Sequence, residues 1–205
     1  MEKEIFLTDL DDVICKGGYL KLLNMFLNTS YVESDFFNQY YLEEIAESED
    51  VKTEIRRYWI EKNVYDYSHL IDGAYDSLKM ISEELEIYVC SSTHFPGVEP
   101  KLLSKIYAQK FNYITENLPF IKPENIIFSC NKSIFNDRVL IQLDDKVNNL
   151  NSDALIKLLF YAGHNKDFFS KESITSDDEY RNLLRCKNWE DVCYFVQNRD
   201  IYEIW

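Results

Sequence analysis

Short apolar runs alternate with segments of helical periodicity along most of the chain. The runs that have the length and composition of buried strands are residues 4–9, 86–91, 125–130, 139–143 and 155–160. Between them, residues 74–84 and 101–113 place apolar side chains at the spacing of an amphipathic helix. This alternation predicts an α/β fold built on a Rossmann-like parallel sheet.

A long helical segment interrupts the alternation after the first strand. About 75 residues separate that strand from the next one, which is too many for a single crossover helix. Helical patterns cover residues 18–27, 34–45 and 50–62 in this gap. We therefore predict an α/β core formed by residues 1–15 and 73–205, with a small helical cap, residues 16–72, inserted after strand 1.

The last part of the chain is less regular. Residues 164–187 are polar, and we expect a surface loop with a short helix there. A terminal helix is predicted from about Trp189 to Val196, where apolar residues again recur at helical spacing.

Composition excludes several classes of protein. With 205 residues the chain can form one substantial core, with or without a small accessory lobe. A formal charge of −14 disfavours binding to a nucleic-acid polymer, which requires clustered Lys and Arg. No stretch approaches the roughly 18 continuous apolar residues of a membrane helix, so no membrane partner is expected.

The cysteines and the amino terminus point to a cytoplasmic protein. Glu2 and Glu4 precede the first apolar run, which is unlike a secretory signal peptide. The five cysteines form no Cys-x-x-Cys pair and are odd in number, which favours reduced thiols. Cys90 and Cys130, in or beside apolar runs, are expected to be small core residues.

Polar residues follow each of the first four predicted strands. In order along the chain these are Asp9 and Asp11, Ser91 and Ser92, Lys132, and Asp144 and Asp145. Ligands of open parallel sheets bind outside the carboxyl ends of the strands, so these side chains are expected at one site. Each motif alone also fits a structural role: the aspartates in turns, the serines at a loop start and the lysine at the surface.

Taken together, these residue types suit phosphate chemistry. Converging carboxylates form an oxygen-rich site of the kind that Mg²⁺ prefers, and lysine and serine can bind a phosphate group. A carboxylate that faces the phosphate can act as a nucleophile, and a second one two residues away can act as general acid and base. The chemistry then depends mainly on positioning and on neutralising charge.

The order of these motifs resembles that of the haloacid-dehalogenase-like phosphohydrolases. More narrowly, it is similar to the 5′(3′)-deoxyribonucleotidases of the cytosolic and mitochondrial nucleotidase type. The similarity covers most of the chain, in the segments LTDLDDVICKGGYL, YWIEKNVYDYSHLIDGA, IYVCSSTHFP, FYAGHNKDF and NWEDVCYFV.

The resemblance implies a role for each of these residues. Asp9 would be the nucleophile and a Mg²⁺ ligand, and Asp11 the acid/base, with its backbone carbonyl on the metal. Asp145 would complete the metal site with support from Asp144. The phosphate would be held by Ser91, Ser92 and Lys132. A nucleoside pocket would be formed by Phe36, Phe37, Asn38 and Tyr65, although packing within the cap is an equally good interpretation of these aromatic residues.

The chain departs from the family pattern at several positions. Asp12 stands where the family has glycine, which adds a carboxylate near the metal. Leu103 and Ile106 occupy the positions of a lysine and a tryptophan, although Lys101 and Lys105 lie close by. Ser91 replaces threonine, Thr93 proline and Lys146 arginine. These changes leave the catalytic set intact and leave the substrate preference open.

The resemblance implies a Mg²⁺-dependent phosphatase that hydrolyses (deoxy)nucleoside monophosphates through an aspartyl-phosphate intermediate. Two alternatives remain open: a phosphatase of the same class for another small phosphomonoester, and a catalytically weak relative that binds nucleotides. The expected partner is a small-molecule phosphomonoester, most simply a nucleotide, and a homodimer is an open alternative to a monomer.

Overall fold

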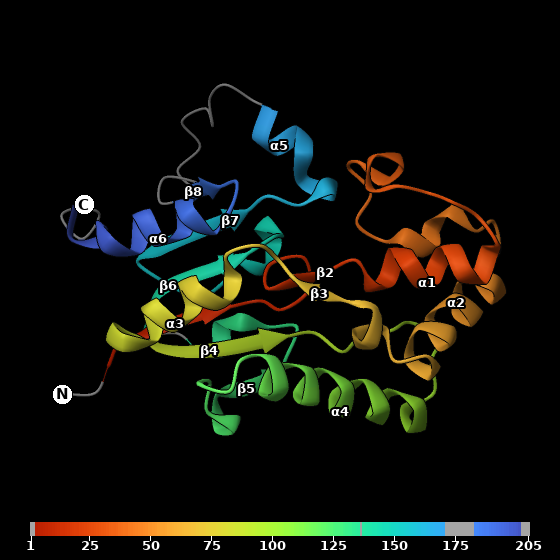
Figure 1. The fold of residues 1–205 in the computed structure, drawn as a ribbon, viewed down its shortest axis with the longest axis horizontal. Helices are drawn as coiled ribbons and strands as arrows, with labels where there is room; N and C mark the ends of the chain where they lie inside the picture. Colours follow the sequence, from red (N-terminus) through yellow and green to blue (C-terminus); the bar gives the residue numbers. More distant parts are fainter. Residues whose placement is uncertain (1–2, 136, 171–182, 202–205) are drawn as a thin grey trace.

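A six-stranded parallel sheet forms the centre of the molecule (Figure 1). The computed structural model describes residues 3–135, 137–170 and 183–201. Every neighbouring pair of strands is parallel, in the order β5-β4-β1-β6-β7-β8. The strands are β1 (Ile5–Thr8), β4 (Glu86–Ser91), β5 (Ile126–Phe128), β6 (Val139–Asp144), β7 (Ile156–Phe160) and β8 (Leu183–Cys186). The predicted α/β fold is confirmed.

Strand β1 lies between β4 and β6, and all four of its residues are buried. Phe6 faces the main core, which also contains Leu78 and Trp189. Ile5 and Leu7 face a smaller cluster on the other side of the sheet. Burial on both faces explains why this strand is a continuous apolar run.

Helices α3 (Ala74–Glu84) and α6 (Trp189–Gln197) pack against each other. The indole Nε1 of Trp189 donates a hydrogen bond of 3.0 Å to the carbonyl of Val13, which ties α6 to the loop after β1. Helix α4 (Pro100–Asn117) follows β4, and α5 (Lys166–Ser170) follows β7. Short 3₁₀ helices outside the segment between β2 and β3 cover Pro123–Asn125, Lys132–Phe135, Val147–Asn149, Gly163–Asn165 and Arg199–Ile201.

A helical insertion, residues 17–68, lies between β2 (Cys15–Lys16) and β3 (His69–Leu70), which pair antiparallel. It contains α1 (Gly18–Leu27), α2 (Glu49–Glu61) and 3₁₀ helices at Glu33–Phe36, Leu42–Ile45 and Val64–Tyr67. In Figure 1, α1 and α2 lie to the right of the sheet. The predicted cap boundaries, residues 16 and 72, fall at this two-stranded ribbon, and the division into cap and core stays a prediction.

The first turn of α1 lies against the end of the helical insertion. A Cβ atom on Gly18 would lie 2.2 Å from the carbonyl oxygen of Val64, so no larger residue fits there without a backbone shift. Gly17, directly before it, has a φ of +93°, which favours glycine. The Gly-Gly pair thus allows the start of α1 to approach the chain where it returns to the sheet.

Three predictions about elements and packing are wrong. Residues 34–45 do not form one helix: Asn38 adopts a left-handed φ of +65°, and its backbone N–H donates to the carbonyl of Gly163 instead of continuing a helix. The sequence reading also missed β8, a short edge strand of four residues with arginine in its middle. Cys90 is buried as predicted, but Cys130 is exposed.

The remaining element predictions agree closely with the structure. The short helix expected within residues 164–187 is α5, and residues 171–182 of that stretch lie outside the described residues. Among the helices of the described ranges, none combines the length and apolar character that a membrane span requires.

Candidate active site

The carboxyl ends of three neighbouring strands bring the predicted residues together. Asp9 directly follows β1, Ser91 ends β4 and Asp144 ends β6. Because β1 lies between β4 and β6, Asp9 is in the middle of this edge. The strand order thus accounts for the convergence that the spacing of the motifs predicted.

Lys132 connects two of these carboxylates. Its side chain is buried, and its Nζ donates to Asp9 Oδ1 at 2.8 Å and to Asp144 Oδ2. Burial lowers the pKa of the Lys132 ammonium, but the charges of Asp9 and Asp144 outweigh this and hold its pKa above the ordinary value. Lys132 is therefore a fixed positive charge beside Asp9.

Asp9 is a buried carboxyl group among other charges. Burial raises its pKa to about 6, the Lys132 ammonium opposes this shift, and the charges of Asp144 and Asp11 add to it. Asp9 is therefore mainly ionised at neutral pH, as a nucleophile must be.

Asp11 is held on both of its carboxylate oxygens. The hydroxyl of Tyr65 donates to Oδ1 at 2.8 Å, and Nζ of Lys110 donates to Oδ2 at 2.7 Å. Lys110 also donates to Ser91 Oγ at 2.7 Å and to the backbone carbonyl of Ser92 at 2.5 Å. A single buried ammonium thus links the end of β4 to the carboxylate two residues after Asp9.

The sequence reading missed Lys110, although a signal was present. Lys101 and Lys105, which lie close to the expected lysine position in the sequence, are both exposed on α4. Lys110 instead lies among buried residues of the same helix, four residues after Ile106 and four before Ile114. A charged residue on the apolar face of an amphipathic helix needs a partner, which marks it for a buried site.

Asp144 and Asp145 have different surroundings. Asp144 Oδ1 accepts hydrogen bonds from the backbone N–H of Lys146 and from Asn149, at 2.9 and 3.2 Å. Asp145 Oδ2 lies 3.1 Å from Nε2 of His164. Burial raises the pKa of Asp145 well above its ordinary value, and the nearby charges of Asp144 and Asp9 add to the shift.

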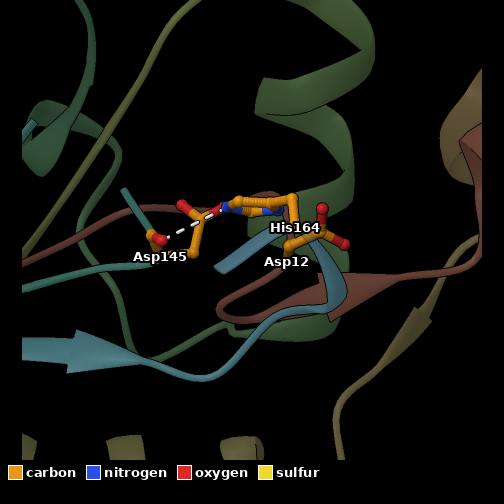
Figure 2. Close-up of side chains that lie close together, drawn as sticks. All are labelled: Asp12, Asp145 and His164. Carbon is orange, nitrogen blue, oxygen red and sulfur yellow. Dashed lines mark hydrogen bonds and ion pairs between the residues drawn. The ribbon is translucent and has the colours of Figure 1, made fainter. Parts of the chain in front are cut away.

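The predicted metal ligands fit a divalent cation in their chemistry. Asp9 and Asp145 are buried carboxyl groups with raised pKa values, so a cation between them would offset the cost of ionising both. All the expected donors are oxygen atoms, which suits Mg²⁺. A different set of residues already has its possible ligand atoms close together. Within the described ranges, this set is Asp12, Asp145 and His164 (Figure 2).

Ser92 and the predicted pocket residues occupy several environments. Ser92 Oγ accepts from the backbone N–H of His94 at 3.2 Å, so this hydroxyl shapes the loop. Phe36 is buried and packs edge-on against Tyr31, which favours the packing interpretation. Asn38 Oδ1 accepts from the backbone N–H of Asp167 at 3.0 Å, which joins the helical insertion to the start of α5.

Phe37 and Tyr65 lie nearer to polar groups. The ring of Phe37 is partly exposed, with Nζ of Lys166 3.9 Å from its centroid. Tyr65 contacts Asp11, as described above, so its hydroxyl belongs to the acid cluster. Tyr65 also lines a cavity of about 570 Å³ between α4 and the helical insertion, together with Asn63, Gln109 and Tyr113.

Two residues that the sequence reading did not assign also approach the site. His164 contacts Asp145, and the ring of Tyr40 lies edge-on to His164 with centroids 4.7 Å apart. Nζ of Lys146 lies 3.9 Å from the centroid of Tyr40. The histidine could not be found by metal-ligand spacing, because its partners come from distant parts of the chain.

Comparison with known proteins places this site in a family. A 5′(3′)-deoxyribonucleotidase of Clostridium acetobutylicum is 32% identical over 115 residues, which cover 56% of this chain and 57% of the relative. One of Bacillus subtilis is 27% identical over 126 residues, 60% of each chain. The matches thus span less than two thirds of the length of these curated relatives.

The fold has counterparts among solved structures. A haloacid dehalogenase-like family hydrolase of Streptococcus pneumoniae superposes with a TM-score of 0.59 at 15% identity, over 94% of this chain and 98% of that one. The family model described as "5′ nucleotidase, deoxy (Pyrimidine), cytosolic type C protein" (NT5C) matches residues 3–196. The chain therefore belongs to the NT5C family, and its fold is that of the haloacid-dehalogenase-like hydrolases.

Proposed function

We propose that this protein is a Mg²⁺-dependent phosphatase that releases phosphate from (deoxy)nucleoside monophosphates through an aspartyl-phosphate intermediate. The observation that carries the proposal is the pairing of two carboxylates with two buried lysines. Asp9 is held by Lys132 and Asp11 by Lys110, and both carboxylates lie just after β1 in the middle of the sheet edge. The family membership and the deoxyribonucleotidase relatives support the substrate class.

Asp9 is the proposed nucleophile. In the first step its carboxylate oxygen attacks the phosphorus atom, which forms an acyl phosphate, and the bond from phosphorus to the leaving oxygen breaks. In the second step water attacks phosphorus, the bond from phosphorus to the Asp9 oxygen breaks, and phosphate is released. Lys132 keeps Asp9 in place at 2.8 Å and offsets charge during the attack. Asn at this position would keep the shape but remove the negative charge.

Asp11 is the proposed general acid and base. It gives a proton to the leaving oxygen in the first step and takes one from the attacking water in the second, so it returns to its starting state. Tyr65 and Lys110 hold its two oxygens in place, one each. These two contacts correspond to the ionised form of Asp11, which takes a proton from the water; in the protonated form the carboxyl group would donate to the leaving oxygen in place of one of them.

The remaining groups bind phosphate. Lys110 and the Ser91 hydroxyl, 2.7 Å apart, offer an ammonium and a hydrogen bond to its oxygens. A Mg²⁺ ion held by Asp9 and Asp145, with the backbone carbonyl of Asp11, would neutralise further phosphate charge.

Two regions can receive the nucleoside. Phe37 offers a partly exposed aromatic face near α5, and the cavity beside Tyr65 offers the amides of Asn63 and Gln109. We favour Phe37 as the residue that stacks on the nucleobase, because the Tyr65 hydroxyl already donates to Asp11. We also propose a cytoplasmic location, which the five free cysteines support.

The test is a panel of phosphate esters assayed with Mg²⁺ and with EDTA, on wild-type protein and on Asp9→Asn. We expect Mg²⁺-dependent release of phosphate from nucleoside monophosphates and none from an Asp9→Asn variant that keeps the fold. If phosphate is released equally slowly from all nucleotides and quickly from another small ester, the protein would instead be a phosphatase for that ester. Phosphate release by Asp9→Asn at the wild-type rate would contradict the mechanism.

A further inference from the structure

Asp12, Asp145 and His164 come from three separate loops and meet beside the proposed active site. Asp12 lies in the turn after β1, Asp145 follows β6 and His164 lies in the 3₁₀ helix after β7. One ligand atom from each lies within 4.8 Å of the other two. Figure 2 shows the imidazole ring between the two carboxylates.

The carboxylate of Asp12 has no role in holding the turn. The turn is fixed by the backbone, since the N–H of Asp12 donates to the carbonyl of Cys15 at 2.8 Å. Within the part of the chain that the structure describes, no hydrogen bond or ion pair engages the Asp12 side chain, which is exposed. The Asp12 carboxylate is therefore accessible to a ligand.

The other two side chains are already positioned. Asp145 is buried, and its backbone carbonyl accepts from Asn165 at 2.7 Å, which fixes the loop that carries it. Nε2 of His164 lies 3.1 Å from Oδ2 of Asp145 and 3.2 Å from the Asp145 backbone carbonyl oxygen, so a bound cation would take the place of the proton that Nε2 shares with these oxygens. A cation held at about 2.1 Å from each donor requires donor atoms no more than about 4.2 Å apart. Rotation of the exposed Asp12 side chain can close the remaining distance.

The donor set differs from that of the proposed Mg²⁺ site. Asp9 is engaged by Lys132, and both oxygens of Asp11 are engaged by Tyr65 and Lys110. Asp145 is the one residue that the two sets share. A set of two carboxylates and one imidazole suits divalent transition metals better than Mg²⁺, which prefers oxygen ligands only.

We propose that Asp12, Asp145 and His164 form a second divalent-cation site, which binds a transition-metal ion such as Mn²⁺ next to the Mg²⁺ site. The inference rests on the proposed function in one respect: it takes the Mg²⁺ ion to be held by Asp9 and Asp145. It gives a purpose to Asp12, which stands where related sequences are expected to have glycine. It also predicts that Mg²⁺ and Mn²⁺ bind together and do not compete for a single position.

The experiment counts Mn²⁺ bound to the full chain in excess Mg²⁺, by the electron paramagnetic resonance signal of free Mn²⁺. We expect one Mn²⁺ per chain, with coupling to an imidazole nitrogen in pulsed spectra. Asp12→Asn and His164→Gln should each weaken Mn²⁺ binding at least about tenfold, and His164→Gln should remove the nitrogen coupling. Asparagine tolerates the left-handed φ of +58° at position 12, so that variant should fold.

Glu33→Gln is the matched control. Glu33 is exposed and contributes negative charge near Asp12, but it is not one of the three ligands. Its substitution should leave Mn²⁺ affinity within about twofold, since charge at a distance is screened. Equal weakening by Glu33→Gln and Asp12→Asn would mean that the effect is general electrostatics, which would overturn the site.

Other outcomes are equally decisive. Absence of bound Mn²⁺ in excess Mg²⁺, absence of nitrogen coupling, or unchanged binding by Asp12→Asn would each overturn the second site. If Mg²⁺-dependent phosphate release persists in that case, the proposed function stands without the second site. If two cations bind and no phosphate ester is hydrolysed, the second site stands and the proposed function fails.

Discussion

Nζ of Lys110 lies 2.7 Å from Oδ2 of Asp11 and the same distance from Oγ of Ser91. Helix α4 thus places the Lys110 ammonium between the proposed acid/base, Asp11, and the proposed phosphate-binding hydroxyl of Ser91. Lys110→Met should lower kcat/KM by about 10²–10³-fold, because a preorganised charge is lost where charge develops. Steady-state kinetics on a nucleoside monophosphate measure this.

Lys101→Met is the control for that substitution. Lys101 lies on the same helix but is exposed and contacts none of these groups in the described structure. It should keep activity within about twofold, as exposed substitutions usually have small effects. Equal losses in the two variants would mean that the helix, and not the ammonium of Lys110, is responsible.

The hydroxyl of Tyr65 should matter most for poor leaving groups. Tyr65→Phe removes the 2.8 Å hydrogen bond to Asp11 and keeps the ring, which packs near Tyr113. We expect kcat to fall about tenfold for a nucleoside monophosphate, whose leaving oxygen needs a proton, and much less for p-nitrophenyl phosphate. Equal losses on both substrates would show that Tyr65 does not act through protonation of the leaving oxygen. Tyr67→Phe, in the same 3₁₀ helix, should be neutral.

How much could be predicted from the sequence depended on whether the decisive contacts were local. The apolar runs and the motif after each strand predicted the sheet and the positions of Asp9, Ser91, Lys132 and Asp144, because strand ends are local features. The partners of Asp11 could not be assigned, since Lys110 is 99 positions away and Tyr65 is 54 positions away. Only the packing of α4 and the helical insertion brings them together.

The same reasoning applies to the wrong predictions. Residues 34–45 have a helical pattern, but Asn38 pairs with Gly163, a contact that no local pattern indicates. Strand β8 is short, and it is a strand because it pairs with β7, a contact that its own sequence does not indicate. No local spacing marks His164 as a ligand, because it lies 19 positions from Asp145, yet the loop after β7 carries it to that carboxylate.

Phe37 and Phe36 provide a paired test of the nucleoside pocket. Phe37→Ala should raise KM for nucleotides more than for a generic aryl phosphate, because its partly exposed ring, which Nζ of Lys166 contacts on one side, would stack on a base with its other face. Phe36→Ala should instead destabilise the fold by about 3–5 kcal/mol, since that ring is buried. If Phe37→Ala affected both substrates equally, Phe37 would be a packing residue.

Removal of the metal should make stability depend on pH in an unusual direction. The pKa of Asp9 is raised to about 6, and that of Asp145 is raised well above its ordinary value, mainly by burial. A carboxyl group with a raised pKa stabilises the folded state when it is protonated, and this contribution is lost as pH rises through the folded-state pKa. For Asp9 the loss is on the order of 3 kcal/mol, from a shift of about two pH units.

Thermal unfolding at pH 5.5 and pH 7.5, with EDTA or with Mg²⁺, tests this. Mg²⁺ binds the ionised carboxylates, so it should raise Tm strongly at pH 7.5 and little at pH 5.5. Asp145→Asn removes one of the two buried acidic groups that would bind the metal, so it should reduce the rise in Tm that Mg²⁺ causes at pH 7.5. A Mg²⁺ effect that is equal at both pH values would contradict the assignment, because protons would then not compete with the metal for Asp9 and Asp145.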